Sequence, residues 1–210
     1  MHVPKVIARQ IILSNLQKRF RRVLWNPPSD PNFNPVVWFA NHHSWHDGFL
    51  VYASLDKCGR EGVDLVTDPL AARIFGRAGA IHAPESDATA RGLNFRKCLR
   101  EMQAGKVLVI FPEGELHRPP LVEKIRPGLV RIAKWEPRTA FQPIGIRVEM
   151  SMHERPEAWI NFGKAIPASR ISNEVAGSAL ENLISFSTEE ACQDSQNWKI
   201  LVEGSKSAHE

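Results

Sequence analysis

Two short apolar runs in this sequence each end directly in a cluster of polar residues. The run over 36–40 leads into Asn-His-His-Ser-Trp-His-Asp, and the run over 106–111 leads into Pro-Glu-Gly-Glu. Both runs are rich in β-branched and aromatic residues, which predicts buried strands. Because ligands bind outside the carboxyl ends of strands in open α/β sheets, the two polar clusters are the first candidates for a functional site.

Helical stretches separate these runs from further candidate strands. Strands alternating with helices predict one α/β domain with a largely parallel or mixed sheet, and 210 residues suffice for its core. The strand over 141–148 is expected to be interrupted at Pro143 and Gly145. The remaining elements expected are strands over 63–67 and 158–162, helices over 48–55, 88–103 and 129–135, and polar, helical chain after residue 172.

Residues 1–25 predict a basic amphipathic helix. Its apolar side comprises Leu13, Leu16, Phe20, Val23 and Leu24, and basic residues between positions 18 and 22 fall on the other side. Two interpretations remain open. The helix lies on an anionic membrane surface with its basic face toward the head groups, or it packs its apolar side on the domain.

The rest of the chain divides by composition. Residues 26–35, rich in Pro and Asn, predict a loop, residues 36–203 the main domain, and residues 204–210 a flexible tail. Three isolated cysteines without a CxxC motif predict neither a disulfide framework nor a cysteine zinc site, which favours the cytoplasm. No signal peptide and no apolar run of about 20 residues is evident. A lipid-directed role would therefore place the protein peripherally, on the inner face of a membrane.

A net charge of +4 is compatible with an anionic membrane, anionic substrates or nucleic acid. The basic residues are not interleaved with aromatic residues that could stack on bases, and no nucleic-acid fold signature occurs. We therefore expect no nucleic-acid partner.

The first polar cluster contains a histidine and an aspartate that can form a catalytic pair. On a regular helix, His42 and Asp47 would be separated by about 140°, so they meet only in a turn or at a helix start. In that geometry Asp47 binds one imidazole nitrogen and the other nitrogen is left as a base. Such a base would let a substrate hydroxyl attack an acyl thioester.

Other interpretations of this cluster remain open. The histidines can be ordinary loop residues, or His42, His46 and Asp47 can bind a metal with His82 or His117, as in a metal-dependent hydrolase. No HExxH motif occurs, and we expect no metal.

The second polar cluster places Glu113 and Gly114 at the end of the strongest predicted strand. Arg118 offers a bidentate donor for a phosphate or carboxylate, and Lys124 and Arg126 add positive charge. The alternative is a surface turn with solvated charges.

Together these clusters resemble a known family. Asn-His-x-Ser-x-x-Asp at 41–47 is similar to the first motif of the PlsC-like glycerolipid acyltransferases, which include lysophosphatidate and lysophospholipid acyltransferases. Phe-Pro-Glu-Gly at 111–114 is similar to their third motif, with Arg118 near its following arginine. The stretch 124–128 resembles the Lys-x-Gly region after that motif, and Pro143 lies in a likeness of the fourth.

The resemblance implies a fold of the glycerolipid acyltransferase type and an O-acyltransferase activity. A fatty acyl group would pass from coenzyme A or acyl carrier protein to the hydroxyl of a lysolipid, with no further cofactor. His42 would be the general base and Asp47 its orienting partner. The residues implied in substrate binding are Asn41, Ser44, Glu113, Gly114 and, near the head group, Arg118. A non-catalytic membrane-lipid-binding module is the alternative outside enzymes.

Two positions depart from the family pattern. Glu85 stands where the second motif has an arginine that meets the acceptor phosphate, and Glu115 replaces the usual threonine after Pro-Glu-Gly. Arg73, Arg77 or Arg91 could substitute for that arginine. The departures weaken the case for lysophosphatidate and leave lysophospholipid, lyso-aminolipid and glycolipid acceptors open.

Overall fold

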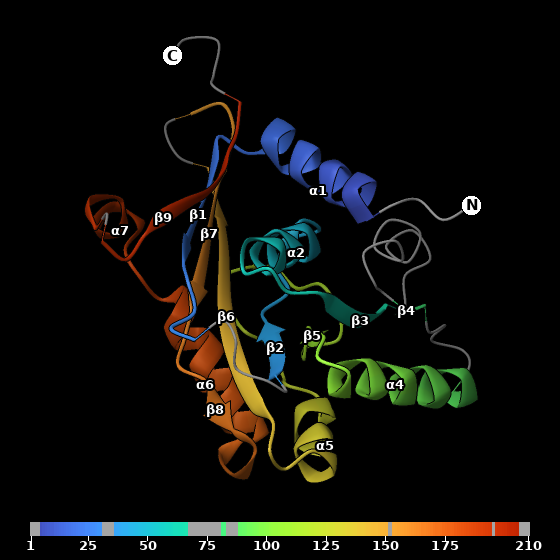
Figure 1. Ribbon diagram of the computed structural model, residues 1–210. Coiled ribbons are helices and arrows are strands. Elements are labelled where there is room, and N and C mark those ends of the chain that lie inside the picture. Colours follow the sequence, from blue (N-terminus) through green and yellow to red (C-terminus); the bar gives the residue numbers. More distant parts are fainter. Residues whose placement is uncertain are drawn as a thin grey trace.

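A mixed sheet runs through the whole domain (Figure 1). The computed structural model describes residues 5–30, 36–66, 81–82, 88–150, 153–194 and 196–205. The strand order is β4-β3-β5-β2-β6-β7-β1-β9, and β8 pairs with β6 beside this path. The strands are β1 (Arg22–Asn26), β2 (Val36–Ala40), β3 (Gly62–Val66), β4 (Ile81–His82), β5 (Val107–Ile110), β6 (Ala140–Glu149), β7 (Glu157–Phe162), β8 (Ile166–Pro167) and β9 (Lys199–Glu203).

Strands β4, β3, β5, β2 and β6 are mutually parallel. β7 then runs antiparallel to β6, β1 parallel to β7, and β9 antiparallel to β1. The predicted single α/β domain with a mixed sheet is therefore confirmed. The helices are α1 (Lys5–Arg19), α2 (Asp47–Lys57), α4 (Ala88–Gln103), α5 (Gly128–Trp135), α6 (Asn173–Ile184), α7 (Thr188–Gln193) and the short 3-10 turn η2 (Ala168–Arg170).

Side-chain alternation along β2 divides the core into two layers. Val36, Trp38 and Ala40 pack in one apolar cluster with buried residues of α1 and α2, whereas Val37 and Phe39 pack in a second cluster with α4, α5 and α6. Helices therefore cover both faces of the sheet, as Figure 1 shows. This explains why the strand is apolar at every position.

The prediction of one helix over residues 1–25 is wrong after Arg19. α1 ends at Arg19, and β1 follows as an inner strand between β7 and β9. Val23 and Leu24 are buried as strand residues, although their spacing from Leu16 and Phe20 also fits a helix. Because β1 belongs to the sheet, the domain does not begin at residue 36 as predicted.

The apolar side of α1 packs on the domain. Leu16 and Phe20 are buried in the same cluster as α2, so the second of the two interpretations of this helix holds for these residues. Val6, Ile7 and Ile11, nearer the start of α1, remain exposed.

The last described residues of the chain are also hydrogen-bonded to the rest of the domain. The amides of Gly204 and Ser205 donate to the carbonyls of Arg21 and Gln17 at 3.0 and 2.9 Å, so the flexible tail does not begin at 204. Residues 206–210 lie outside the described residues, as do residues 31–35 of the predicted loop. Within the described chain, no helix combines the length and apolarity needed to cross a membrane.

β6 is continuous, contrary to the interruption predicted at Pro143 and Gly145. Pro143 lies where the neighbour of β6 changes, because β8 pairs with Ala140 and Phe141 and β7 pairs only from Ile144 onward. The missing amide hydrogen of proline therefore breaks no ladder on that side. Gly145 lies where α6 comes so close that a Cβ atom would be 2.7 Å from the backbone of Leu183.

We expect the variant Gly145→Ala to lower the free energy of unfolding by about 1–3 kcal/mol, because Leu183 can yield only if α6 moves. Urea denaturation measures this change. The matched control is Gly92→Ala in α4, where a Cβ atom meets nothing within 4 Å and alanine should stabilise by roughly 0.5–1 kcal/mol. Equal stabilities of the two variants would contradict the close approach of α6.

Candidate active site

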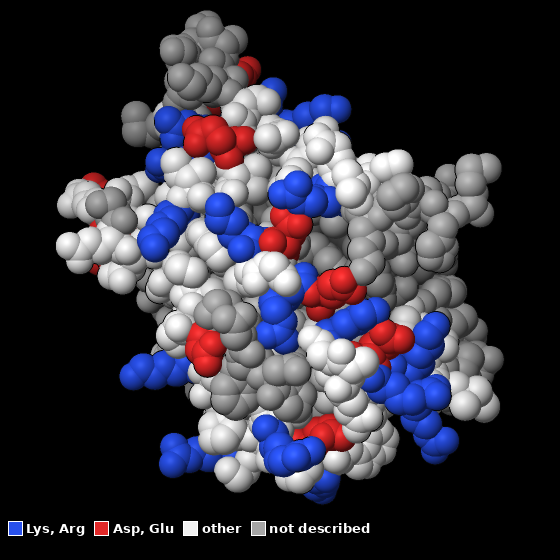
Figure 2. All heavy atoms as spheres, viewed as in Figure 1, with Lys and Arg blue, Asp and Glu red and all other residues white. Residues whose placement is uncertain are grey.

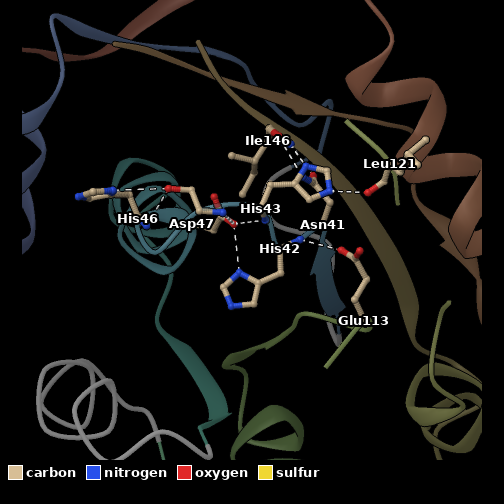
Figure 3. A network of polar contacts seen from close by, with 9 residues as sticks. Asn41, His42, His43, His46, Asp47, Glu113, Leu121 and Ile146 are labelled. Carbon is tan, nitrogen blue, oxygen red and sulfur yellow. Dashed lines mark hydrogen bonds and ion pairs between the residues drawn. The ribbon is translucent and has the colours of Figure 1, made fainter. Parts of the chain in front are cut away.

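The turn after β2 folds around the carboxylate of Asp47. Asp47 Oδ2 lies 3.1 Å from His42 Nδ1 and accepts hydrogen bonds from the amides of His43 and Ser44, both at 2.8 Å (Figure 3). Asp47 is also the first residue of α2, where the helix dipole favours a negative charge. Burial raises the pKa of this carboxyl, and the hydrogen bonds from His42 and the two amides oppose the rise.

The pairing fixes which nitrogen of His42 is available for chemistry. Since Asp47 accepts at Nδ1, that nitrogen carries the proton and Nε2 keeps a free lone pair. The ring stacks on Phe111 at the end of β5, with centroids 4.4 Å apart. Its side chain is 25% exposed, so a substrate can reach it. The predicted pairing of His42 with Asp47 is present.

The neighbouring histidines have other partners. His43 Nδ1 faces the amide nitrogen of Asn41 at 3.0 Å, and its Nε2 donates to the carbonyl of Leu121 at 2.9 Å. The ring of His46 packs edge-on against Phe20, which lies just after α1. Burial, followed by the nearby Arg19, lowers the pKa of His46. His43 and His46 therefore hold the turn in place.

The side chain of Asn41 connects the turn after β2 to β6 and does not line the site. The side chain is fully buried, its Oδ1 accepts from the amide of Ile146 at 2.7 Å, and its Nδ2 donates to the carbonyl of the same residue at 2.9 Å. This pair extends the parallel β2–β6 ladder by one residue beyond Ala40. The structure thus gives Asn41 a positioning role in place of the implied contact with substrate.

Glu113 ties β5 to the same turn. Its buried carboxylate accepts from the amide of His42 at 2.7 Å through one oxygen and from the amide of Glu123 at 2.8 Å through the other. Both oxygens are engaged by backbone, so Glu113 also positions the turn rather than facing a substrate.

Gly114 has φ of 80°, a conformation that favours glycine. A Cβ atom at this position would lie 2.6 Å from the Arg126 guanidinium. Gly114 therefore lets the chain after β5 fold back under Arg126.

The remaining predicted residues lie around the turn. Ser44 Oγ accepts from the amide of His46 at 3.1 Å. Arg118 is exposed, and within the described part of the chain no ion pair engages it. Glu85 of the second motif lies outside the described residues, as do its possible substitutes Arg73 and Arg77 and the side chain of Arg91.

A cavity of about 650 Å³ lies beside the pair, on the side of β6 and α6. Asp47 contributes to its wall, and Asp47 Oδ1 has no hydrogen-bond partner among the described residues. Sequence reasoning did not predict this wall, because Arg147 and Glu149 lie at the end of β6 without any motif. The lining is His43, Ser44, Asp47, Pro119, Pro120, Ile146, Arg147, Val148, Glu149, Ile184 and Ser185.

Comparison with known proteins shows the family of this chain. A family model described as Acyltransferase matches residues 25–147, from the end of β1 to the far part of β6. The chain belongs to the acyltransferase family. The matched segment contains both His42–Asp47 and Glu113.

Two individual proteins are similar. The lyso-ornithine lipid O-acyltransferase of Pseudomonas aeruginosa is 27% identical over 112 residues, which are 53% of this chain and 43% of that protein. The chain thus matches less than half the length of this relative. The crystal structure of the 1-acyl-sn-glycerophosphate acyltransferase PlsC from Thermotoga maritima superposes with a TM-score of 0.53 and 14% identity, covering 91% of this chain and 83% of that one. That likeness shows a shared fold.

The role of Glu113 generates a prediction. In Glu113→Gln, the amide group must face one of two backbone donors, so one hydrogen bond becomes a repulsion. We expect a loss of roughly 1–3 kcal/mol in the free energy of unfolding, measured by urea denaturation. In the control Glu115→Gln, only an exposed contact with Arg126 is lost, and the change should stay below about 1 kcal/mol.

The metal-site alternative is also testable. Among the described residues, no three His, Cys, Asp or Glu side chains gather as metal ligands, and His42 and Asp47 are bound to each other. We expect any turnover to survive dialysis against EDTA. A loss of activity that zinc restores would support the metal-dependent hydrolase instead.

Proposed function

We propose that this protein is an O-acyltransferase that moves a fatty acyl group from a thioester to the hydroxyl of a lysolipid. The observation that carries the proposal is the buried Asp47 carboxylate at 3.1 Å from Nδ1 of a His42 side chain that is 25% exposed. Because the chain belongs to the acyltransferase family, we assign acyl transfer as the reaction that His42 assists.

The proposed reaction is a direct transfer. His42 Nε2 removes the proton from the acceptor hydroxyl while the oxygen attacks the thioester carbonyl carbon. The C–O bond forms, the C–S bond breaks, and the imidazolium then gives its proton to the leaving thiolate. Asp47 stabilises the imidazolium between these two proton transfers. The products are an ester and a free thiol, and no acyl-enzyme forms.

For the acceptor, we favour a lyso-aminolipid over lysophosphatidate. Glu85 replaces the arginine that the family uses for the acceptor phosphate, and a carboxylate there would repel such a group. The relative from Pseudomonas aeruginosa is named for a lyso-ornithine lipid, whose head group carries an amine. Coenzyme A and acyl carrier protein both remain suitable donors, because both present the acyl group on the same kind of thiol.

We also propose that the protein works at the inner, cytoplasmic face of a membrane without spanning it. Its acceptor and product are both lipids, and the net charge of +4 favours an anionic surface.

The test is thioester turnover by the purified protein. We expect release of free thiol and an acylated lipid when acyl-CoA or acyl carrier protein is offered with a panel of lysolipids that includes lyso-ornithine lipid and lysophosphatidate. His42→Ala should lower kcat by about 10²–10⁴-fold, whereas His43→Gln, which keeps a side-chain donor toward Leu121, should lower it far less.

Several outcomes would contradict the proposal. Thiol release without an acylated product would indicate a thioesterase. Vesicle binding that is indifferent to His42→Ala, with no turnover from folded protein, would indicate a lipid-binding module. Preference for lysophosphatidate would contradict the acceptor assignment and leave the acyltransferase intact.

A further inference from the structure

Four large apolar side chains are exposed near the candidate active site. Trp45, Leu116, Leu121 and Met150, here called the strand-end rim, are between 43% and 70% exposed. Exposing them to water is unfavourable, and a cluster of such residues around a functional site marks an interaction surface.

The topology places the strand-end rim at one edge of the sheet. Trp45 follows β2, Leu116 and Leu121 follow β5, and Met150 follows β6. These three strands are adjacent and parallel, so their carboxyl ends meet at the same edge. His42 and Glu113 follow β2 and β5 within three residues. His43 Nε2 also donates to the carbonyl of Leu121, so the strand-end rim lies at the same edge as the candidate active site.

The same edge carries a small excess of exposed positive charge, with Arg118, Lys124 and Arg126 against Glu115 and Glu123. Arg118 lies between Leu116 and Leu121, and Lys124 follows shortly after; within the described part of the chain, neither forms an ion pair. Apolar side chains interleaved with unpaired basic ones suit an anionic lipid surface, where the former enter the boundary of the acyl chains and the latter bind the head groups.

α1 is less well placed for this contact. Its last turn reaches the active-site turn, because Phe20 just beyond it contacts His46, whereas Arg9 pairs with Asp56 near the other end of α2 at 2.8 Å. The two helices therefore run antiparallel. The exposed Val6 and Ile7 precede Arg9 and lie toward the edge of the sheet remote from His42.

We propose that the strand-end rim, rather than α1, is the surface that binds the membrane. A bilayer bound there lies against the edge of the sheet where His42 is exposed. The lysolipid acceptor can then reach His42 while most of it stays in the bilayer. The inference rests on the proposed function, since it assumes that the acceptor is a lipid.

The test compares three double variants. Leu116→Ser/Met150→Ser alters the strand-end rim, and Val6→Ser/Ile7→Ser alters α1. The matched control is Leu93→Ser/Trp135→Ser on α4 and α5, where two side chains that are 58% and 55% exposed line a groove with Arg96, Arg100 and Lys134. Basic side chains gather over this part of the molecule (Figure 2), so the control also combines apolar and positive groups.

Each variant is sedimented with vesicles of phosphatidylglycerol and phosphatidylcholine. Turnover is then measured with an acceptor embedded in the vesicles and with a short-chain, monomeric acceptor. We expect the rim variant to lose vesicle binding and vesicle turnover by about tenfold while its turnover of the monomeric acceptor stays unchanged. The α1 and control variants should bind as the wild type does.

Loss of binding in the α1 variant alone would assign the membrane contact to α1 and overturn the proposal. Equal loss in the control variant would show non-specific adsorption and overturn it as well. A wild type without turnover on either acceptor would refute the proposed function, whereas vesicle binding would still report on the strand-end rim. If the strand-end rim bound a protein partner and not vesicles, the proposal would also be overturned.

Discussion

The arrangement of the site depends on one oxygen atom. Asp47 Oδ2 accepts from the imidazole of His42 and from two successive backbone amides, at distances of 2.8 to 3.1 Å. The amides fix the turn whether or not His42 is charged, so in the proposed reaction the carboxylate would be in place before the imidazole gains a proton. Preorganisation of this kind spares the reorganisation that a flexible loop would require during proton transfer.

Two further buried side chains connect this turn to the sheet. Asn41 bonds to both backbone groups of Ile146, and Glu113 bonds to the amides of His42 and Glu123. Side-chain groups thus continue the hydrogen bonding where the strands separate. Asn41 and Glu113, which the family resemblance implies as substrate contacts, here bind backbone groups and hold the turn that carries His42.

The sequence predicts the central strands and the pairing of His42 with Asp47, because apolar runs and short-range spacing are local signals. It does not distinguish a helix from a strand at Val23 and Leu24, since their spacing fits α1 and only the partners β7 and β9 decide. The partner of Asn41 and the cavity beside Asp47 depend on contacts between distant segments. Local patterns carry no information about such contacts.

The order of the strands delays the pairing of β1 while the chain is being synthesised. β1 is made early, yet both of its neighbours, β7 and β9, come from the last third of the chain. Asn26 and its register partner Asn161 are separated by 135 positions, which a ribosome adding about 5–20 residues per second covers in roughly 7–27 s. During that interval Leu24 and Trp25 have no sheet to enter. The buried side chains of β1 therefore meet their native strand partners only after β7 and β9 have been made.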